Sequence, residues 1–349
     1  MSNSVAQRQN ARNGLLDVLR LLSIVLVVLA HVSPPGWLFQ LRNFDVPLLI
    51  LVSAYVVGMP GGRAPEYGNG LIKRIERLII PVWLFLFIFF SLFFILGKIS
   101  GSIYPYLPKT ILSTFLLLDG IGYVWIIRIN ILMALLAPCL YVIEKKSGKW
   151  LWLLLPAVLM CFELAFRAAA GVENFVFAPL FKYVIFAAIP YALVYMVGLR
   201  LPKMENVALL WLSFGSLGVF LFLAFLLKAN GMDVSTQHYK YPAQTYYLAY
   251  AIAIASALFY LGRRFLLEDK LPLVVIRLGG YSMWIYLWHI LVLTLLQRYM
   301  PNLHWFVMFV FVFSGAVAAT LLMRAAATKV LSMVRNPRVA YYLEIAFLK

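Results

Sequence analysis

Three polar side chains stand in an otherwise apolar stretch near the start of the chain, at residues 13–33. Asp17, Arg20 and His31 interrupt the run NGLLDVLRLLSIVLVVLAHVS. At about 100° and about 1.5 Å per residue, the steps from Arg20 to His31 return the helix to within about 20° of its starting direction and climb about 16 Å. Asp17 precedes Arg20 by three residues, so the two side chains can pair on that face. This spacing predicts a membrane helix with a polar track along one side.

Two simpler interpretations of this stretch compete with the polar track. Arg20 can snorkel to one interface while His31 lies near the opposite head groups, and the spacing alone does not decide against this. The stretch can also be a secretory signal cleaved near Ala30, but a charge inside the apolar region and the length of the run argue against cleavage. We therefore interpret residues 13–33 as the first permanent membrane helix.

The composition of the whole chain excludes a soluble globule. Of 349 residues, 64% are hydrophobic and only 12% are charged, and the mean hydropathy is +0.91. The formal charge of +17 does not indicate nucleic-acid binding, because Lys and Arg fall in short clusters at alternate ends of apolar runs, as topology signals do. Cys139 and Cys161 lie inside apolar runs without neighbouring metal ligands, which predicts packing residues and no metal site.

Apolar runs of membrane-spanning length predict an all-α, polytopic helix bundle with about ten transmembrane helices. The segment Ile111–Leu118 is too short to span and follows Pro105 and Pro108, which indicates an interfacial or re-entrant piece. After residues 13–33, the predicted spans are Phe44–Met59, Leu78–Leu96, Ile121–Ile143, Trp150–Phe166, Pro179–Leu199, Val207–Leu227, Gln244–Leu261, Leu278–Gln297 and His304–Met323.

The distribution of Lys and Arg over the loops predicts that both termini lie in the cytosol. In this orientation Arg20 is near the cytosolic face and His31 near the outer face. We expect residues 1–349 to form a single integral membrane domain, with a cytosolic N-terminal tail at 1–13 and a basic cytosolic C-terminal tail at 324–349. No linker or internal repeat divides the chain.

Cysteine accessibility tests this topology. Single cysteines placed at Gly148 and Asn302, in a background without Cys139 and Cys161, should be labelled by a membrane-impermeant reagent from opposite sides of the membrane. Labelling of both positions from the same side would contradict the predicted orientation.

Several short motifs lie along the helical core. The first run contains Asp-x-x-Arg, a His follows that Arg after ten residues, and the second run contains VPLLILVSAY. Arg74 and Arg77 form Arg-x-x-Arg before the third helix, and Trp125, Pro138 and the segment LGGYSMWIYLWH at Leu278–His289 follow. Together these motifs resemble the type 3 acyltransferase family of membrane enzymes. The chain departs from the family at Ser53-Ala54-Tyr55, where Ser-Gly-aromatic is common, and at Asp45, where an uncharged residue is usual.

The resemblance implies an O-acyltransferase that moves an acyl group, most simply acetyl, from cytosolic acyl-CoA to a hydroxyl of a lipid-linked or cell-surface polysaccharide or lipopolysaccharide. It further implies a bacterial inner-membrane location and a glycan acceptor, while the composition predicts contact with membrane lipids and no nucleic-acid partner. In this interpretation His31, Arg20 and Asp17 are catalytic. Arg74, Arg77 and Arg20 bind the phosphates of the donor, although Arg74 and Arg77 on spacing alone are also ordinary topology determinants beside Lys73.

Imidazole suits acyl transfer because it can act near neutral pH as a base or as a nucleophile that carries the acyl group. His289 is a second candidate. It is equally consistent with a packed residue bonded to Tyr286 or Ser282 at helical spacing. His238 and His304 are expected at the surface.

Trp125, Arg128 and Asp45 are candidate residues for substrate contact. Arg128 and Asn130 interrupt the fourth long span, where they can line the acceptor side of a cavity or, for Arg128, pair with Glu163. A transporter or flippase for a glycan intermediate is the alternative function, because it also requires a polar track and aromatic contacts to sugars.

Overall fold

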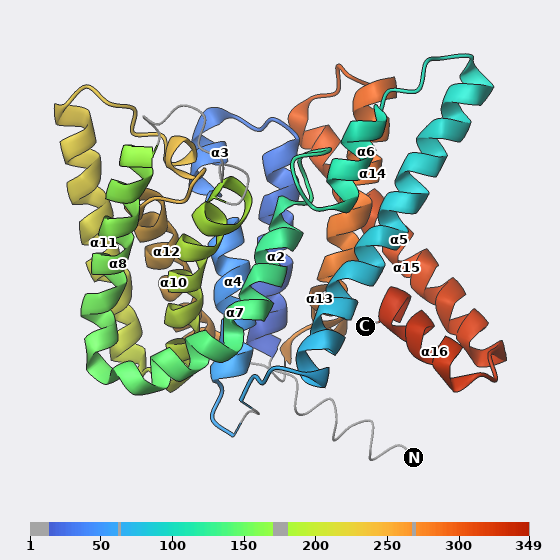
Figure 1. Ribbon diagram of the computed structural model, residues 1–349. Coiled ribbons are helices and arrows are strands. Elements are labelled where there is room, and N and C mark those ends of the chain that lie inside the picture. The colour runs from blue at the N-terminus through green and yellow to red at the C-terminus, as the bar shows by residue number, and fades with distance from the viewer. Residues whose placement is uncertain (1–13, 62–63, 170–180, 267–269, 349) are drawn as a thin grey trace. The chain divides into compact units, whose positions relative to one another are not determined.

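The computed structural model describes residues 14–61, 64–169, 181–266 and 270–348, and the predicted N-terminal tail at 1–13 lies outside these ranges. Within them the regular structure is helical and contains no β-strand (Figure 1). The predicted all-α class is therefore confirmed.

Eight helical stretches in the described ranges are long and apolar enough to cross a membrane, and a ninth arises if the interrupted pair Leu273–Gly280 and Ser282–Tyr299 forms one span. The sequence predicts ten because it divides Trp125–Phe166 into two spans. This stretch has 42 residues and counts here as one. At about 1.5 Å per residue it is about 63 Å long, roughly twice the hydrocarbon thickness of a bilayer.

The chain divides into two compact units, each assembled from three separate segments. The first unit comprises Met1–Gly62, Ser147–Ala169 and Leu193–Met283. Its helices are α2 (Gly14–His31), α3 (Gly36–Leu41), α4 (Asp45–Gly58), η1 (Gly148–Trp150), α8 (Leu151–Ala169), the end of α10 (Phe186–Arg200), η3 (Leu201–Lys203), α11 (Asn206–Ala229), η4 (Thr236–Tyr239), α12 (Thr245–Phe265) and α13 (Leu273–Gly280).

Close helix contacts in this unit depend on residues without a side chain. A Cβ at Gly279 of α13 would lie 2.3 Å from the carbonyl oxygen of Asp17 in α2, and a Cβ at Gly58 of α4 would lie 2.1 Å from the carbonyl oxygen of Leu199 in α10. Both distances are shorter than van der Waals contact, so only glycine fits. The glycines thereby bring α13 against α2 at Asp17, and α10 against the end of α4.

The second unit comprises Arg63–Lys146, Ala170–Ala192 and Trp284–Lys349. Its short helix α6 confirms that residues 111–118 do not span. A cluster of Phe and Tyr rings on α5 and the segment after it, among them Phe89, Phe93 and Tyr106, packs in its core. Its helices are α5 (Asn69–Ser100), α6 (Pro108–Phe115), α7 (Trp125–Ser147), η2 (Phe181–Ile185), the start of α10, α14 (Ser282–Tyr299), α15 (Trp305–Met333), α16 (Pro337–Leu343) and η6 (Glu344–Leu348).

Most residues of the predicted C-terminal tail, at 324–348, lie in helices, namely the end of α15, α16 and η6. The indole of Trp284 donates to the carbonyl of Ala346 at 3.1 Å, and Arg324 donates to the carbonyls of Phe347 and Leu348. Ile345 and Ala346 are buried, and η6 packs against α5 and α15. The predicted cytosolic location of this segment stays a prediction.

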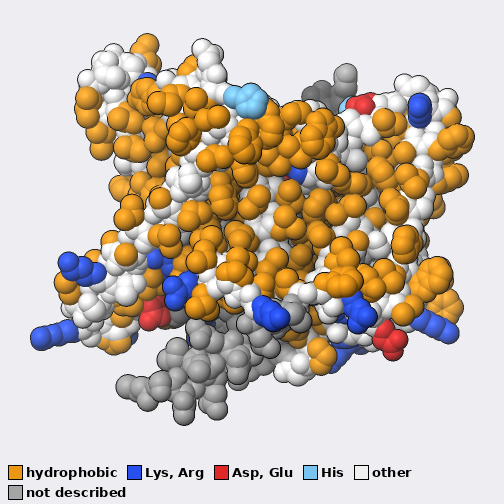
Figure 2. Space-filling view, turned by 180° about the vertical axis from the view of Figure 1, so that it is seen from behind, with side chains coloured by type: hydrophobic (Ala, Val, Ile, Leu, Met, Phe, Trp, Pro, Cys, Tyr) orange, Lys and Arg blue, Asp and Glu red, His pale blue; other side chains and the backbone are white. Residues whose placement is uncertain are grey.

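Large apolar side chains cover the outside of the protein, as Figure 2 shows for one face. On α11, Trp211 is 73% exposed and Phe225 is 69% exposed. Exposure of this kind suits contact with lipid chains and not with water. The prediction that Cys139 and Cys161 are packing residues is wrong, since both side chains are exposed. An apolar position on a membrane helix can face lipid as well as protein.

We expect Gly279→Ala to lower the thermal stability of the detergent-solubilised protein, because the new methyl group must push α13 away from α2. Overpacking of this kind costs about 1–3 kcal/mol. Gly218→Ala on α11 is the matched control, since nothing lies within 4 Å of its added Cβ. Equal melting temperatures for the two variants would contradict the close approach.

Candidate functional site

His31 and Asp45 lie at the same end of a pair of packed helices. The helix α2 ends at His31, and Pro34 and Pro35 follow, which cannot continue it. The short helix α3 then reverses the chain, and α4 begins at Asp45. Since α2 and α4 pack against each other, the end of the first helix meets the start of the second (Figure 1).

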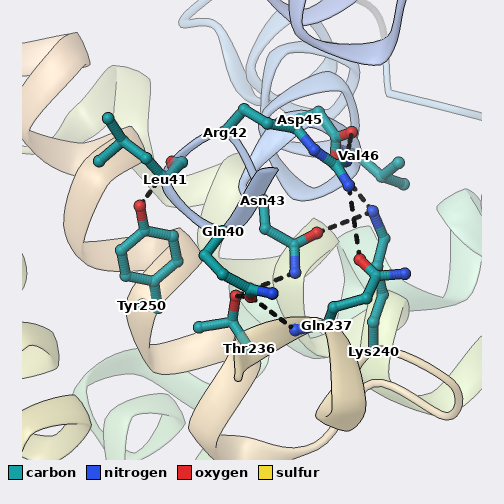
Figure 3. A network of polar contacts seen from close by, with 10 residues as sticks. All are labelled: Gln40, Leu41, Arg42, Asn43, Asp45, Val46, Thr236, Gln237, Lys240 and Tyr250. Carbon is teal, nitrogen blue, oxygen red and sulfur yellow. Dashed lines mark hydrogen bonds and ion pairs between the residues drawn. The ribbon is translucent and has the colours of Figure 1, made fainter. Parts of the chain in front are cut away.

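A buried carboxylate organises this end of the first unit. Asp45 accepts from Arg42 at 2.6 Å and from Lys240 at 3.1 Å, and Lys240 also donates to the side-chain oxygen of Asn43 at 3.0 Å (Figure 3). The side chains of Arg42, Asp45 and Lys240 are each only 3% exposed. We call these three residues the Asp45 cluster.

Uncharged hydrogen bonds join the same two segments beside the cluster. Gln40 accepts from the Thr236 hydroxyl at 2.8 Å and from the backbone N–H of Gln237 at 3.2 Å. The amide of Asn43 donates to Thr236 at 3.0 Å, and the hydroxyl of Tyr250 donates to the carbonyl of Leu41 at 2.5 Å. The chain between α2 and α4 is thus held firmly to the segment around η4 (Figure 3).

Burial lowers the pKa of the Lys240 ammonium group, because the charged form loses its hydration. The carboxylate of Asp45 opposes this change, while the positive charge of Arg42 adds to it. The ammonium group therefore depends on Asp45 for its charge, which makes the cluster sensitive to the loss of any one member.

His31 is half-buried and belongs to this electrostatic environment. Its ring interacts with the charges of Asp45, Arg42 and Lys240, and Asp45 has the strongest charge interaction of the three. An imidazole in such a place can take a proton from a hydroxyl group or attack an activated carbonyl carbon.

The opposite end of α2 carries the predicted pair of Asp17 and Arg20. The two side chains are 3.0 Å apart, as the spacing predicts. Asp17 is fully buried beneath α13 at Gly279, while the side chain of Arg20 keeps 30% of its exposure. The guanidinium group of Arg20 is therefore held by Asp17 and remains partly accessible. It lies about 16 Å along the helix from His31.

Arg74 and Arg77 lie in the first turns of α5, in the second unit. Arg74 is half-buried and Arg77 is exposed. Between them, Glu76 accepts a hydrogen bond from the Tyr341 hydroxyl at 3.2 Å. The two guanidinium groups are thus near the folded C-terminal segment, and they are available for an anionic ligand.

His289 is a packed residue of the second unit. It is fully buried, its Nδ1 bonds to the carbonyl of Tyr286 one turn earlier, and its ring contacts Tyr123 edge-on with centroids 6.3 Å apart. The Tyr286 hydroxyl donates to the Tyr123 carbonyl. This arrangement agrees with the packing interpretation of His289, and Ser282 lies half-buried at the start of α14.

Arg128 and Glu163 each have partners within their own unit. Arg128 donates to the carbonyl of Leu117 at 2.6 Å and lies over the Tyr183 ring. Glu163 accepts from the backbone N–H and the hydroxyl of Thr245. The structure therefore gives Arg128 and Glu163 partners other than each other, unlike the pairing that the sequence offers as one alternative. Trp125 lies 6.5 Å from the ring of Tyr191.

Reasoning from the sequence misses Arg42 and Lys240. Arg42 had a usable signal, because it precedes Asp45 by three residues, the same separation as Asp17 and Arg20. Lys240 had none, since 195 residues separate it from Asp45. His238 and His304 are exposed as expected.

Among the described residues, no group of three or more His, Cys, Asp or Glu side chains could hold a metal ion. A family model described as an acyltransferase domain matches residues 13–325. Neither the curated proteins nor the solved structures contain a significant match.

Proposed function

The chain belongs to the type 3 acyltransferase family and is a membrane acyltransferase, and we propose that it moves an acetyl group from cytosolic acyl-CoA to a hydroxyl of a lipid-linked or cell-surface glycan. The observation that carries this proposal is that the half-buried His31 lies beside the Asp45 cluster at one end of α2. The other end of α2 carries Arg20 in its ion pair with Asp17. Membership of the family supplies the class of reaction, and the imidazole supplies a group able to perform it.

His31 acts on the acceptor or on the acyl group. As a base, its ring nitrogen takes the hydroxyl proton while the oxygen bonds to the thioester carbonyl carbon, the carbon–sulfur bond breaks, and the imidazolium returns the proton to the departing thiolate. As an acyl carrier, the same nitrogen attacks the carbonyl first and the hydroxyl displaces it afterwards. Both routes consume one thioester and yield one ester and one thiol.

Arg74, Arg77 and Arg20 are proposed to bind the phosphates of the donor. Guanidinium groups suit this task because their planar fork donates two hydrogen bonds to one phosphate. The half-buried Arg74 and the exposed Arg77 stand at the start of α5 with side chains that a soluble ligand can reach. Asp17 supports Arg20 through its ion pair.

The acceptor side is proposed to include Trp125, Arg128 and Asp45, with His289, Tyr286 and Ser282 in supporting positions. An inner-membrane location with both termini in the cytosol would place donor and acceptor on opposite faces. A single domain at residues 1–349 would then contain the whole reaction.

Transfer of label decides between this proposal and a glycan transporter or flippase. Purified protein incubated with acyl-labelled acetyl-CoA and glycan-bearing membranes should form a labelled ester on the glycan and release CoA. A heat-inactivated sample is the control. Movement of glycan without consumption of acetyl-CoA would favour the transporter and contradict the proposal.

Substitution of His31 and substitution of the proposed donor-binding arginines should have different effects. His31→Ala should abolish ester formation and leave acetyl-CoA binding largely intact. Arg74→Ala or Arg77→Ala should weaken acetyl-CoA binding, since each loses a charge-assisted contact of about 1.5–3 kcal/mol, or ~10- to 150-fold in Kd. Calorimetric binding and initial rates separate the two effects.

Lys73→Ala is the matched control for the arginines, because it removes an exposed positive charge from the same turn of α5. It should change the Kd for acetyl-CoA far less than Arg74→Ala does. Near-normal turnover by a folded His31→Ala protein would contradict the mechanism and direct attention to His289.

A further inference from the structure

The Asp45 cluster holds more charge than is needed to join its two segments. Uncharged bonds from Gln40, Asn43 and Thr236 already connect the chain around α3 with η4. Burial of ionic groups is costly, and replacement of such pairs by apolar residues is often neutral or stabilising. The retention of a carboxylate and two cations at 3% exposure therefore indicates an electrostatic task as well as an anchoring one.

The group in reach of these charges is His31. Three charged groups act on its ring from three places: Asp45 at the start of α4, Arg42 in the turn before it, and Lys240 just after η4. The carboxylate favours a protonated ring, and the two cations disfavour it. The fold holds these opposing charges close together, with Arg42 at 2.6 Å and Lys240 at 3.1 Å from the carboxylate of Asp45.

Resting on the proposed function, we propose that Asp45 is a positioning residue for His31, held in place by Arg42 and Lys240 so that its carboxylate stabilises the imidazolium that forms when His31 takes the acceptor proton. The positive charges of Arg42 and Lys240 disfavour the imidazolium and so favour transfer of its proton to the departing thiolate. The proton passes from the hydroxyl oxygen to the ring and then to the departing thiolate, so Asp45 and Lys240 neither gain nor lose one over the cycle.

Lys240, which pairs with Asp45, lies 195 residues later in the sequence and approaches α4 only through tertiary folding. Because Asp45 is negative and Lys240 is positive, removal of one or the other should act on His31 in opposite directions.

The test is the pH dependence of ester formation by the purified full-length protein at saturating acetyl-CoA. The acid limb of the profile, where activity rises as His31 loses its proton, should move to lower pH in Asp45→Asn and to higher pH in Lys240→Gln. Loss of one neighbouring charge should displace the limb by about 1 pH unit. The maximal rate of Asp45→Asn should also fall by about tenfold.

Three control variants separate electrostatics from anchoring. Lys240→Arg keeps the charge and should leave the acid limb in place. The double variant Asp45→Asn with Lys240→Gln should bring the limb back towards its original position. Asp233→Asn removes an exposed acid from the same loop as Lys240 and should change neither the limb nor the rate.

Opposite displacements in the two single variants support the proposal. Equal losses of activity with an unmoved limb, or displacements in the same direction, would overturn it and leave the cluster with an anchoring role alone. If Asp45→Asn does not fold, the comparison of Lys240→Gln with Lys240→Arg decides, because the limb should move only in the first. Failure of the unmodified protein to form ester would instead refute the proposed function, and this inference with it.

Discussion

The ion pairs of Asp45 are the interaction on which this end of the first unit depends. They join the turn before α4 to a lysine 195 residues later, and they do so without access to water. A buried carboxylate is stable only when its charge is matched and its oxygens are bonded. Arg42, Lys240 and the backbone N–H of Val46 meet both conditions.

The polar groups at the two ends of the apolar helix α2 differ in where their partners come from. At Asp17 a local pair with Arg20 suffices, and a glycine on α13 allows the two helices to close over the acid. At His31 the helix stops before two prolines, and the neighbouring charges are those of Arg42 and Asp45 in the chain that follows and of Lys240 far away in the sequence. The Asp17 pair is therefore visible in the local spacing, whereas the surroundings of His31 also require a tertiary partner.

Several polar groups of the second unit bond to backbone carbonyls. His289 and Tyr286 bond to backbone carbonyls, and Arg128 does the same at Leu117. Such bonds satisfy carbonyls and side chains that would otherwise be unpaired in an apolar setting. The C-terminal helices extend this pattern, since Trp284 and Arg324 both donate to carbonyls of η6.

The sequence alone determined the all-α membrane class, the approximate position of most helices, the pairing of Asp17 with Arg20 and the family. These features rest on composition, hydrophobic run length and short spacings, all of which are local. Only the tertiary structure decided that Lys240 meets Asp45, that Cys139 and Cys161 are exposed, that Arg128 and Glu163 have different partners, and that residues 324–348 fold back. The reason is physical: helix periodicity relates residues a few positions apart, whereas the partner of a buried charge is chosen by which helices pack together.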